Sequence, residues 1–378
     1  MTRRRLRSLL LLASALAFAG LAQGAVADES TETVVTDTLA IAGEAKLGFG
    51  KGSIIVAPIP LKNPVLGNGV IATGSYLFKL DEGSDTSFIG AAAMKTDNGS
   101  FGAGAAVNLS FGGGRWSVLT MGGKANVNYA IYGIGNLRFN PVPISQDGVF
   151  VRVKASYGLT DHVFAGLDAQ YLDTKISLNG SGPFPLPNLP GFGIGVRQIV
   201  AGPTLTWDTR DDTTYPTKGQ FASLTVQRGV GLGSYNNSFY RGVLAGKAFF
   251  PLGDKTVLGL SATGCSVGDR APFFNMCSVG GTDTLRGYAA GQYIDNALAS
   301  VQGELRHRLT KRIGVVAFAG VSVVGPDLGD LGSSGAKYAG GVGVRFRLSK
   351  DYPLDFSVDQ AVNRDGDTST YVYIGQAF

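Results

Sequence analysis

Residues 149–157 read Val-Phe-Val-Arg-Val-Lys-Ala-Ser-Tyr, and this stretch decides the fold class. Its odd-numbered positions are mostly apolar, whereas Arg152 and Lys154 occupy even-numbered ones. Successive side chains of a β-strand point to opposite faces, so this alternation predicts a strand with one apolar and one charged face. The same period of two recurs in residues 297–309, 338–348 and 352–362. The chain is therefore predicted to be all-β.

Turn residues divide the chain into about sixteen such segments, many of them about 10–12 residues long. We expect strands at 53–60, 68–79, 86–96, 101–111, 115–125, 149–158, 162–176, 196–208, 220–231, 236–250, 255–267, 297–309, 313–323, 337–348, 352–362 and 370–378. A soluble β-sandwich also alternates, but these lengths suit a tilted passage through hydrocarbon, and charges beside small residues suit a water-filled lumen. An even number of strands closes an antiparallel sheet and removes the edges that lipid cannot satisfy. We therefore predict a transmembrane antiparallel β-barrel of about 16 strands over residues 51–378.

The connections between these segments alternate in length. Most even-numbered connections are short, with 210–219 as a partial exception, whereas the odd-numbered ones include 126–148, 177–195 and 268–296. Outer-membrane barrels have short periplasmic turns and long outer loops, and a sandwich has no reason for this asymmetry. The pattern therefore favours a barrel whose N-terminus is periplasmic.

The first residues indicate export. Four arginines at positions 3, 4, 5 and 7 precede an apolar stretch from Leu9 to Leu21, and residues 25–27 read Ala-Val-Ala. A basic start, an apolar middle and small residues before a cleavage site are typical of a secretory signal peptide. We therefore expect a signal peptide at 1–27, a short periplasmic segment at 28–50, and a mature protein in the outer membrane of a Gram-negative bacterium. An uncleaved membrane anchor is the alternative.

Composition agrees with a barrel rather than with membrane helices. The 378 residues include 56 Gly, and 16% of them are charged. Beyond residue 27 no apolar run of about 18 residues occurs, so membrane-spanning helices are not expected. Without the first 27 residues, 29 basic residues face 28 acidic ones. The basic balance of the full chain therefore gives no indication of nucleic-acid binding.

Catalytic and metal-binding patterns are scarce. The two histidines belong to no G-x-S-x-G, H-E-x-x-H or phosphate-loop pattern. Asp208, Asp211 and Asp212 could be read as a calcium site, but their spacing is not that of an EF-hand and Arg210 stands among them. A solvated turn with an internal contact between Asp and Arg fits better. We expect no enzyme activity, no cofactor and no metal.

Cys265 and Cys277 are 12 positions apart. In an exported protein such a pair is more often a disulfide than a metal site, because oxidising compartments preserve disulfides and no His cluster accompanies the pair. We predict a disulfide at the start of the longest loop, where it would shorten the connection and reduce the entropy of the unfolded chain. Two small buried residues are the alternative.

Four stretches form an ordered set of motifs. Residues 280–288 read G-G-T-D-T-L-R-G-Y, and residues 207–212 read W-D-T-R-D-D before a P-x-x-G pattern. The chain end, 371–378, reads Y-V-Y-I-G-Q-A-F, and residues 58–67 contain the weaker pattern P-I-P…N-P…G. In this order they resemble the BamA/TamA-type outer-membrane assembly factors, whose barrel is also called the bacterial surface antigen domain.

In that family the loop with the R-G-[FY] motif folds back into the lumen, where its arginine pairs with acidic groups. The resemblance assigns this lumen loop motif to Leu285, Arg286, Gly287 and Tyr288. It assigns the acidic partner to Glu304, and charge-assisted hydrogen bonds would there replace the lost hydration of Arg286. The family's second acid, in F-x-D-x-G, is missing because residues 318–322 read F-A-G-V-S. We therefore expect a sparser set of charges around Arg286.

The resemblance also assigns roles to two further stretches. The family's periplasmic turn motif corresponds to Asp208, Arg210, Asp211, Pro216 and Gly219. The final strand, which the outer-membrane assembly machinery reads as a signal, corresponds to Tyr371, Tyr373 and Phe378. Alternation directs Val372, Ile374 and Phe378 toward lipid, with Gln376 interrupting that face.

The resemblance implies a role in outer-membrane protein insertion or protein export. Residues 28–50 are too few for the POTRA modules that receive substrates in the family, so a short form without them is expected. The expected partners are outer-membrane lipids, the assembly machinery during biogenesis, and unfolded barrel or exported proteins. A passive porin-like channel and a structural surface-antigen barrel without transport are the alternatives.

Overall fold

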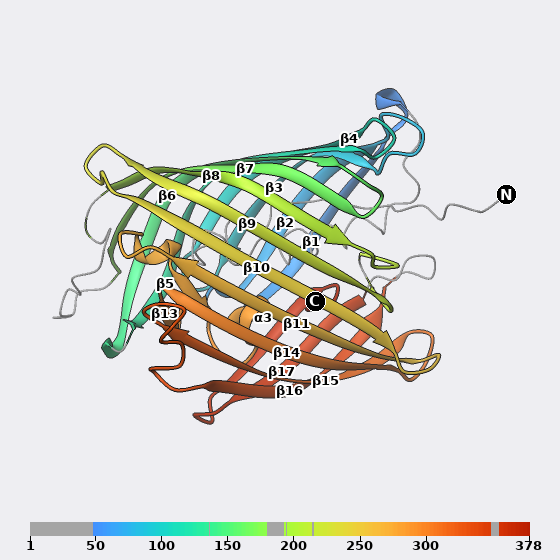
Figure 1. The fold of residues 1–378 in the computed structure, drawn as a ribbon. Coiled ribbons are helices and arrows are strands. Elements are labelled where there is room, and N and C mark those ends of the chain that lie inside the picture. Colours follow the sequence, from blue (N-terminus) through green and yellow to red (C-terminus); the bar gives the residue numbers. More distant parts are fainter. Residues whose placement is uncertain (1–47, 136, 180–192, 194, 214, 349–354) are drawn as a thin grey trace.

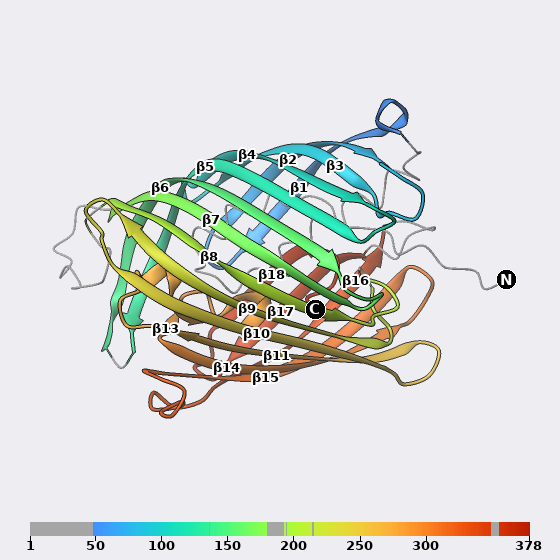
Figure 2. The same ribbon diagram turned by 45° about the horizontal axis from the view of Figure 1, so that its top comes forward.

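Sixteen antiparallel strands form a closed barrel in the computed structural model (Figure 1). The structure describes residues 48–135, 137–179, 193, 195–213, 215–348 and 355–378. Each barrel strand pairs with its neighbours in the chain, except that β11 pairs with β14 and β1 pairs with β18. The first and last strands are therefore neighbours (Figure 2), and the predicted all-β barrel is confirmed.

The barrel strands lie close to the sixteen predicted segments. Their bounds are β1 (Ser53–Asn63), β2 (Gly67–Phe78), β3 (Ser87–Thr96), β4 (Phe101–Phe111), β5 (Trp116–Ile134), β6 (Leu137–Gly158), β7 (Val163–Leu178), β8 (Gly195–Asp208), β9 (Gly219–Leu232), β10 (Ser238–Pro251), β11 (Thr256–Val267), β14 (Ala297–Arg308), β15 (Ile313–Gly325), β16 (Lys337–Arg347), β17 (Asp355–Asn363) and β18 (Thr368–Ile374). A 3-10 turn, η2 (Phe49–Lys51), precedes β1. The predicted signal peptide at 1–27 and most of the segment at 28–50 lie outside the described residues.

The loop between β11 and β14 contains four short elements. They are η3 (Phe273–Asn275), β12 (Cys277–Val279), α3 (Gly281–Thr284) and β13 (Tyr293–Asp295), of which β12 and β13 pair as a small separate sheet. Among the described residues, no helix has the length and apolar character needed to cross a membrane.

The predicted loop at 126–148 is wrong, because β5 and β6 continue through it. The two strands pair as far as Ile134 opposite Leu137. The sequence keeps its alternation of apolar and polar residues past residue 125, and the chain turns only at Gly135, whose φ is 57°. The N–H of Gly135 donates to the carbonyl of Ile294 in β13 at 2.7 Å. The long hairpin therefore reaches across to the loop between β11 and β14.

The alternation in β6 sorts side chains between lipid and lumen as predicted. Val149, Val151 and Val153 are exposed on the outer surface. Arg152 points the other way, and its Nη2 lies 2.5 Å from Oδ2 of the buried Asp168 on β7. An apolar outer face and a polar inner face are what a barrel in lipid requires.

The inner face of the barrel differs between the two ends of the chain. The inward positions of the described strands β1 to β5 hold no charged side chain, and we call this surface the apolar wall. Its larger members include Ile59, Ile71, Leu77, Phe88, Met94, Leu119 and Met121. The inward positions of β14, β16 and β17 are rich in charge, and we call the surface from β14 to β17 the charged wall. Its charged members are Glu304, Arg306, Arg308, Lys337, Arg345, Arg347, Asp355 and Asp359.

Candidate functional site

The long loop between β11 and β14, residues 268–296, is held firmly where it leaves the barrel. A disulfide joins Cys265 of β11 to Cys277 of β12, with their Cα atoms 5.8 Å apart. The N–H of Val267 donates to the carbonyl of Asn296 at 2.7 Å and so closes the neck of the loop. The structure thus contains the disulfide that the cysteine spacing predicts.

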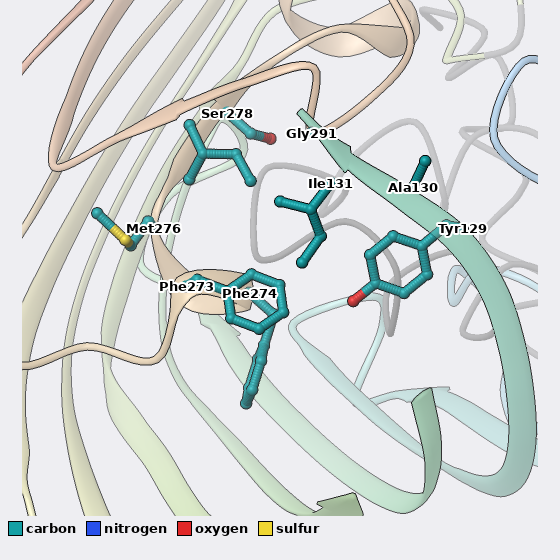
Figure 3. Close-up of a pocket in the computed structure, with 9 residues that line it drawn as sticks. Tyr129, Ala130, Ile131, Phe273, Phe274, Met276, Ser278 and Gly291 are labelled. Carbon is teal, nitrogen blue, oxygen red and sulfur yellow. The ribbon is translucent and has the colours of Figure 1, made fainter. Parts of the chain in front are cut away.

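Apolar side chains anchor the first half of this loop. Phe273, Phe274 and Met276 surround a small pocket beside Tyr129 and Ile131 of β5 (Figure 3). All three loop side chains are buried, as is Ile131. Burial of each side chain of this size stabilises the folded state by about 1.5–3 kcal/mol. The extension of β5 past residue 125 therefore supplies the surface that holds the loop.

Glycines then turn the loop toward the charged wall. Gly280 and Gly281 have φ values of 122° and 80° and lead into α3. Gly287 has a φ of 112°, and a Cβ built there would lie only 2.7 Å from the Cβ of Ala339. Only glycine fits this position without strain. Its N–H donates to the hydroxyl of Tyr371 at 3.0 Å, which attaches the loop to β18.

Leu285 and Tyr288 flank the arginine of the predicted lumen motif. Both side chains are fully buried. The ring of Tyr288 packs edge-on against Tyr293, with 5.7 Å between centroids, and its carbonyl accepts a hydrogen bond from the Tyr371 hydroxyl at 3.3 Å. Water is thereby excluded from both sides of the motif.

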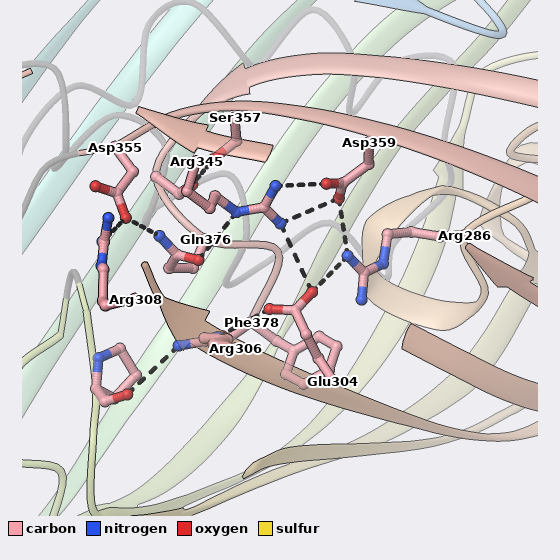
Figure 4. A network of polar contacts seen from close by, with 12 residues as sticks. Arg286, Glu304, Arg306, Arg308, Arg345, Asp355, Ser357, Asp359, Gln376 and Phe378 are labelled. Carbon is pink, nitrogen blue, oxygen red and sulfur yellow. Dashed lines mark hydrogen bonds and ion pairs between the residues drawn. The ribbon is translucent and has the colours of Figure 1, made fainter. Parts of the chain in front are cut away.

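Arg286 lies between two carboxylates in this dry environment (Figure 4). Its Nη1 is 2.6 Å from Oε2 of Glu304 and 2.9 Å from Oδ2 of Asp359. The guanidinium carbon lies 3.7 Å from the centroid of the Phe318 ring, close enough for a cation–π contact. The structure therefore brings together the two residues that the resemblance paired, and it adds Asp359 from β17.

The expected loss of a second acidic partner is wrong, because Asp359 takes that place. The missing Asp of F-x-D-x-G falls at Gly320, where a Cβ would lie 2.8 Å from Cγ of Gln302 and 2.9 Å from Cδ1 of Leu285. An acidic side chain would collide there with the loop. Asp359 is on the charged face of residues 352–362, but its sequence position alone does not show that the loop arginine reaches it.

The same carboxylates bind further arginines of the charged wall. Glu304 Oε1 lies 2.8 Å from Nε of Arg306, and Asp359 Oδ1 lies 2.5 Å from Nη1 of Arg345. Asp355 pairs with Arg308 and with Nε of Arg347, the latter at 2.7 Å. Five arginines, including Arg286, thus share three carboxylates that are fully buried. Buried charges are stable only when they are paired and hydrogen-bonded, so the loss of one member of this set would destabilise the others.

The predicted periplasmic turn is built by its own carboxylates. Asp208 binds Nε and Nη2 of Arg210 at 3.1 and 3.0 Å, and Asp211 accepts hydrogen bonds from the N–H groups of Thr217 and Lys218. Gly219 has a φ of 98°, and a Cβ there would meet the Thr209 carbonyl at 2.3 Å. Within the described part of the chain, no group of three or more His, Cys, Asp or Glu side chains is placed to hold a metal ion.

The same turn contacts the charged wall. The carbonyl of Pro216 accepts a hydrogen bond from Nη1 of Arg306 at 3.4 Å. The ring of Tyr215 lies under Arg308 and Arg347, with the guanidinium carbons 4.7 and 5.1 Å from its centroid. The lumen loop and this turn therefore meet the charged wall from opposite ends of the barrel.

The chain end differs from its predicted course. β18 ends at Ile374, and Gly375 with a φ of 96° turns the chain inward, so the predicted lipid-facing position of Phe378 is wrong. Phe378 is buried among Phe249 and Val257, and its carbonyl accepts a hydrogen bond from Arg306. Gln376 also points inward rather than into the lipid face. It binds Arg345 at 3.2 Å and Asp355 at 2.7 Å.

Two tyrosines of β18 face the same network. Tyr373 donates its hydroxyl proton to Asp359 at 2.7 Å, and Nη2 of Arg345 donates to the same hydroxyl at 3.0 Å. Tyr371 contacts the loop through Gly287 and Tyr288. The role of Tyr371, Tyr373 and Phe378 as an assembly signal stays a prediction.

The barrel closes through a short pairing between its first and last strands. β1 pairs with β2 over all eleven of its residues. The register of β1 with β18 consists of Lys62 opposite Val372, and we call this junction the seam. Within the described residues, the edge of β1 from residue 53 to residue 61 is not paired with β18. Among the described barrel strands, the seam is therefore the junction with the fewest paired residues.

Comparisons with known proteins agree with this architecture. Residues 198–378 match the family described as the Omp85 superfamily domain. BamA from Haemophilus ducreyi lacking POTRA domains 1–3 has a similar structure, with a TM-score of 0.56 and 14% identity over 85% of this chain and 69% of that chain. CdiB from Acinetobacter baumannii has a TM-score of 0.56 and 12% identity over 85% of this chain and 59% of that one. CdiB from Escherichia coli has a TM-score of 0.55 and 14% identity over 85% of this chain and 62% of that one. No curated protein matches in sequence.

The fold and the loop-borne arginine define a membrane-spanning β-barrel with an occupied lumen. Residues 198–378 match the Omp85 superfamily domain, and the predicted family resemblance is confirmed over that part of the chain. At these identities the solved structures show a shared fold, and the chain spans less than two thirds of either CdiB chain. The family and the barrel together point to a Gram-negative outer membrane.

Proposed function

We propose that this protein assists the insertion of unfolded β-barrel proteins into the outer membrane, using the seam edge of β1 as a template. The observation that carries the proposal is the single residue pair that joins β1 to β18. An unpaired strand edge offers N–H and C=O groups to any other chain, although Pro58 and Pro60 of β1 have no N–H to donate. Lipid cannot satisfy these groups, so an incoming strand is stabilised by pairing with them.

The charged wall supports this role by holding the other side of the seam in place. Tyr371 and Tyr373 connect β18 to Gly287 of the loop and to Asp359 of β17. When β18 moves away from β1, these contacts keep it attached to the rest of the barrel. The seam is then the place where the cylinder opens, and the walls on either side stay intact.

Expected partners follow from this role. They are outer-membrane lipids around the barrel, unfolded barrel proteins at the seam, and the assembly machinery that inserts this chain itself. Export through a cleaved signal peptide at 1–27 belongs to the same proposal.

A passive channel is the less favoured function. Residues 268–296 occupy the lumen through Arg286 and through the apolar anchors around Phe273. Planar-bilayer recordings should therefore give a mostly closed barrel with brief openings, whereas a porin would conduct steadily. Steady conductance by the intact protein would favour the channel.

Reconstitution into liposomes tests the insertion activity. The protein should accelerate folding of an unfolded outer-membrane barrel over the rate in empty liposomes. Lys62→Cys with Val372→Cys places cysteines opposite one another across the seam. Oxidation of this pair should abolish the acceleration, and reduction should restore it.

A matched control uses the pair Gln360→Cys and Thr370→Cys, which lie opposite one another between β17 and β18. This crosslink leaves the seam free and should leave the acceleration unchanged. Equal rates with and without the protein, or equal rates for the locked and unlocked seam, would contradict the proposed function.

A further inference from the structure

The edge of β1 at the seam has apolar surroundings on both of its faces. On the lipid side, Ile54 and Val56 are 76% and 78% exposed, more than any other large apolar side chain of the described barrel strands. On the lumen side stand Ala57, Ile59 and Leu61. A strand that pairs with this edge therefore meets apolar neighbours whichever way its side chains point.

The lumen side of this edge is also shielded from water. Ile59 is 9% exposed, and its cross-strand partner Ile71 in β2 is 4% exposed. Farther along the apolar wall, Phe88 and Met94 of β3 are buried as well. Within the described strands β1 to β5 no inward side chain offers a charge to pair with. A charged side chain brought here would lose its hydration and gain no partner.

The strand that closes the seam has a matching composition. In β18 the lumen-facing residues Ser369, Tyr371 and Tyr373 carry no charge, and Val372 and Ile374 alternate with them. Cross-strand side-chain pairs stabilise a sheet when both members are apolar or aromatic. β18 and the apolar wall thus suit each other.

We infer that the edge of β1 accepts substrate strands whose lumen-facing side chains are apolar, aromatic or uncharged, and rejects strands with charged ones. This inference rests on the proposed function, because it names the class of strand that the seam takes. The apolar wall sets the selection, and the lipid-facing side chains of the substrate do not discriminate, since every barrel strand is apolar on that face.

Disulfide trapping at β1 measures this selectivity. Val56→Cys places a thiol on the exposed lipid side of β1, and the described residues contain no free cysteine to compete with it. Two peptides of about ten residues share the same lipid-facing side chains and one cysteine. One has Tyr and Leu at its lumen-facing positions, and the other has Lys there. We expect the uncharged peptide to be trapped at least about tenfold more.

Variants of the apolar wall reverse the preference. Ile59→Glu should raise trapping of the Lys peptide and lower that of the uncharged one. Leu61→Glu, at a half-buried position of the same strand, makes the same test where the first change prevents folding. A thiol at Leu244→Cys on β10, which is paired on both edges, should trap neither peptide and so measures unspecific insertion.

The outcomes separate this inference from the proposed function. Equal trapping of the two peptides at position 56, above the β10 control, would overturn the selectivity while leaving the seam as an acceptor. No trapping of either peptide above the control would overturn both.

Discussion

The apolar wall and the charged wall line the same barrel interior, but one is stabilised by apolar packing and the other by ion pairs. The charged wall places five arginines against three carboxylates, and all of these arginines except Arg306 pair with a carboxylate of another strand or join the loop to the wall. The apolar wall has no such cross-links and depends on packing of side chains such as Phe88 and Met94. An ion pair with hydrogen bonds holds two side chains in a defined geometry, whereas apolar contacts have no preferred direction. The ion pairs thus brace β14 to β18, whereas a movement within β1 to β5 would break backbone pairing but leave no inward-facing charge unpaired.

The seam lies where the charged wall and the apolar wall meet. β18 is tied to the braced unit through Tyr371 and Tyr373, and β1 borders the apolar wall. Separation of β1 from β18 therefore breaks little beyond one residue pair.

Glu304→Ala should have the largest effect on stability. It leaves Arg286, Arg306 and Arg345 without their shared carboxylate inside the barrel. Breaking a buried ion pair by removing one partner costs about 3–5 kcal/mol of folding free energy. Urea unfolding in detergent and the temperature at which the folded gel band is lost measure this change.

The matched control is Met94→Leu on the apolar wall, which conserves volume and should cost less than about 1.5 kcal/mol. Combining Glu304→Ala with Arg286→Ala should cost less than the sum of the two single changes, since the pair acts together. If Glu304→Ala and Met94→Leu proved equally mild, the distinction between a braced and an unbraced wall would be lost.

Removal of the disulfide should have the next largest effect. Cys265→Ser with Cys277→Ser frees the first half of the loop, and the loss should be about 2–4 kcal/mol because the unfolded chain gains entropy. Proteolysis should then cut within residues 268–296 sooner than in the parent protein. Ser278→Ala beside Cys277 is the control and should not change the cutting rate. Unchanged protection of the loop would show that the apolar anchors hold it without the disulfide.

Gly320→Asp should be destabilising, although it restores the acid that the family motif carries. The new side chain meets Leu285 and Gln302 at less than 3 Å from its Cβ. Overpacking of this kind costs about 1–3 kcal/mol. Gly314→Ala, an inward position near the other end of the same strand, is the control for a glycine change in β15. A stabilised Gly320→Asp protein would contradict the view that Asp359 replaces the missing acid.

The strands of the charged wall could be predicted because each carries its own alternation. Residues 338–348 and 352–362 show one charged and one apolar face without reference to the rest of the chain. β3 reads Ser-Phe-Ile-Gly-Ala-Ala-Ala-Met-Lys-Thr, apolar on both faces, and its bounds came from turn residues instead. The bounds of β3 can therefore be predicted from local turn residues, whereas its apolar composition alone does not show that it belongs to the apolar wall.

The misplaced features depend on contacts between distant residues. The meeting of Arg286 with Asp359 depends on the path of a loop through the lumen, which glycines 280, 281 and 287 set. Phe378 was placed toward lipid by extending the alternation through Gly375, where a left-handed φ breaks it. From the sequence, the pairing of Arg286 with Glu304 could be predicted only through the family resemblance. Residue spacing gave no indication that Asp359 is the second acidic partner.

Asp81 should give the smallest effect and acts where the apolar wall ends. It joins the turn after β2 to the turn after β4, accepting hydrogen bonds from Ser84 and from the N–H groups of Gly112 and Gly113 at 2.8 and 3.2 Å. The Ser84 hydroxyl, followed by these amides, lowers the pKa of Asp81 below its usual value of 3.8. A lowered pKa in the folded state stabilises the protein above pH 3.8, and this contribution is lost as the pH falls through the folded value.

Asp81→Asn should therefore lower the unfolding temperature slightly at pH 7, by less than about 1 kcal/mol in free energy because solvent screens this exposed carboxylate. The difference from the parent protein should vanish only when the pH falls below the lowered pKa of folded Asp81, where the parent carboxylate is also protonated. Glu82→Gln removes a charge from the same turn and is the control. A difference that persists unchanged in acid would mean that Asp81 acts through its shape rather than its charge, and that the apolar wall has no electrostatic link even at its end.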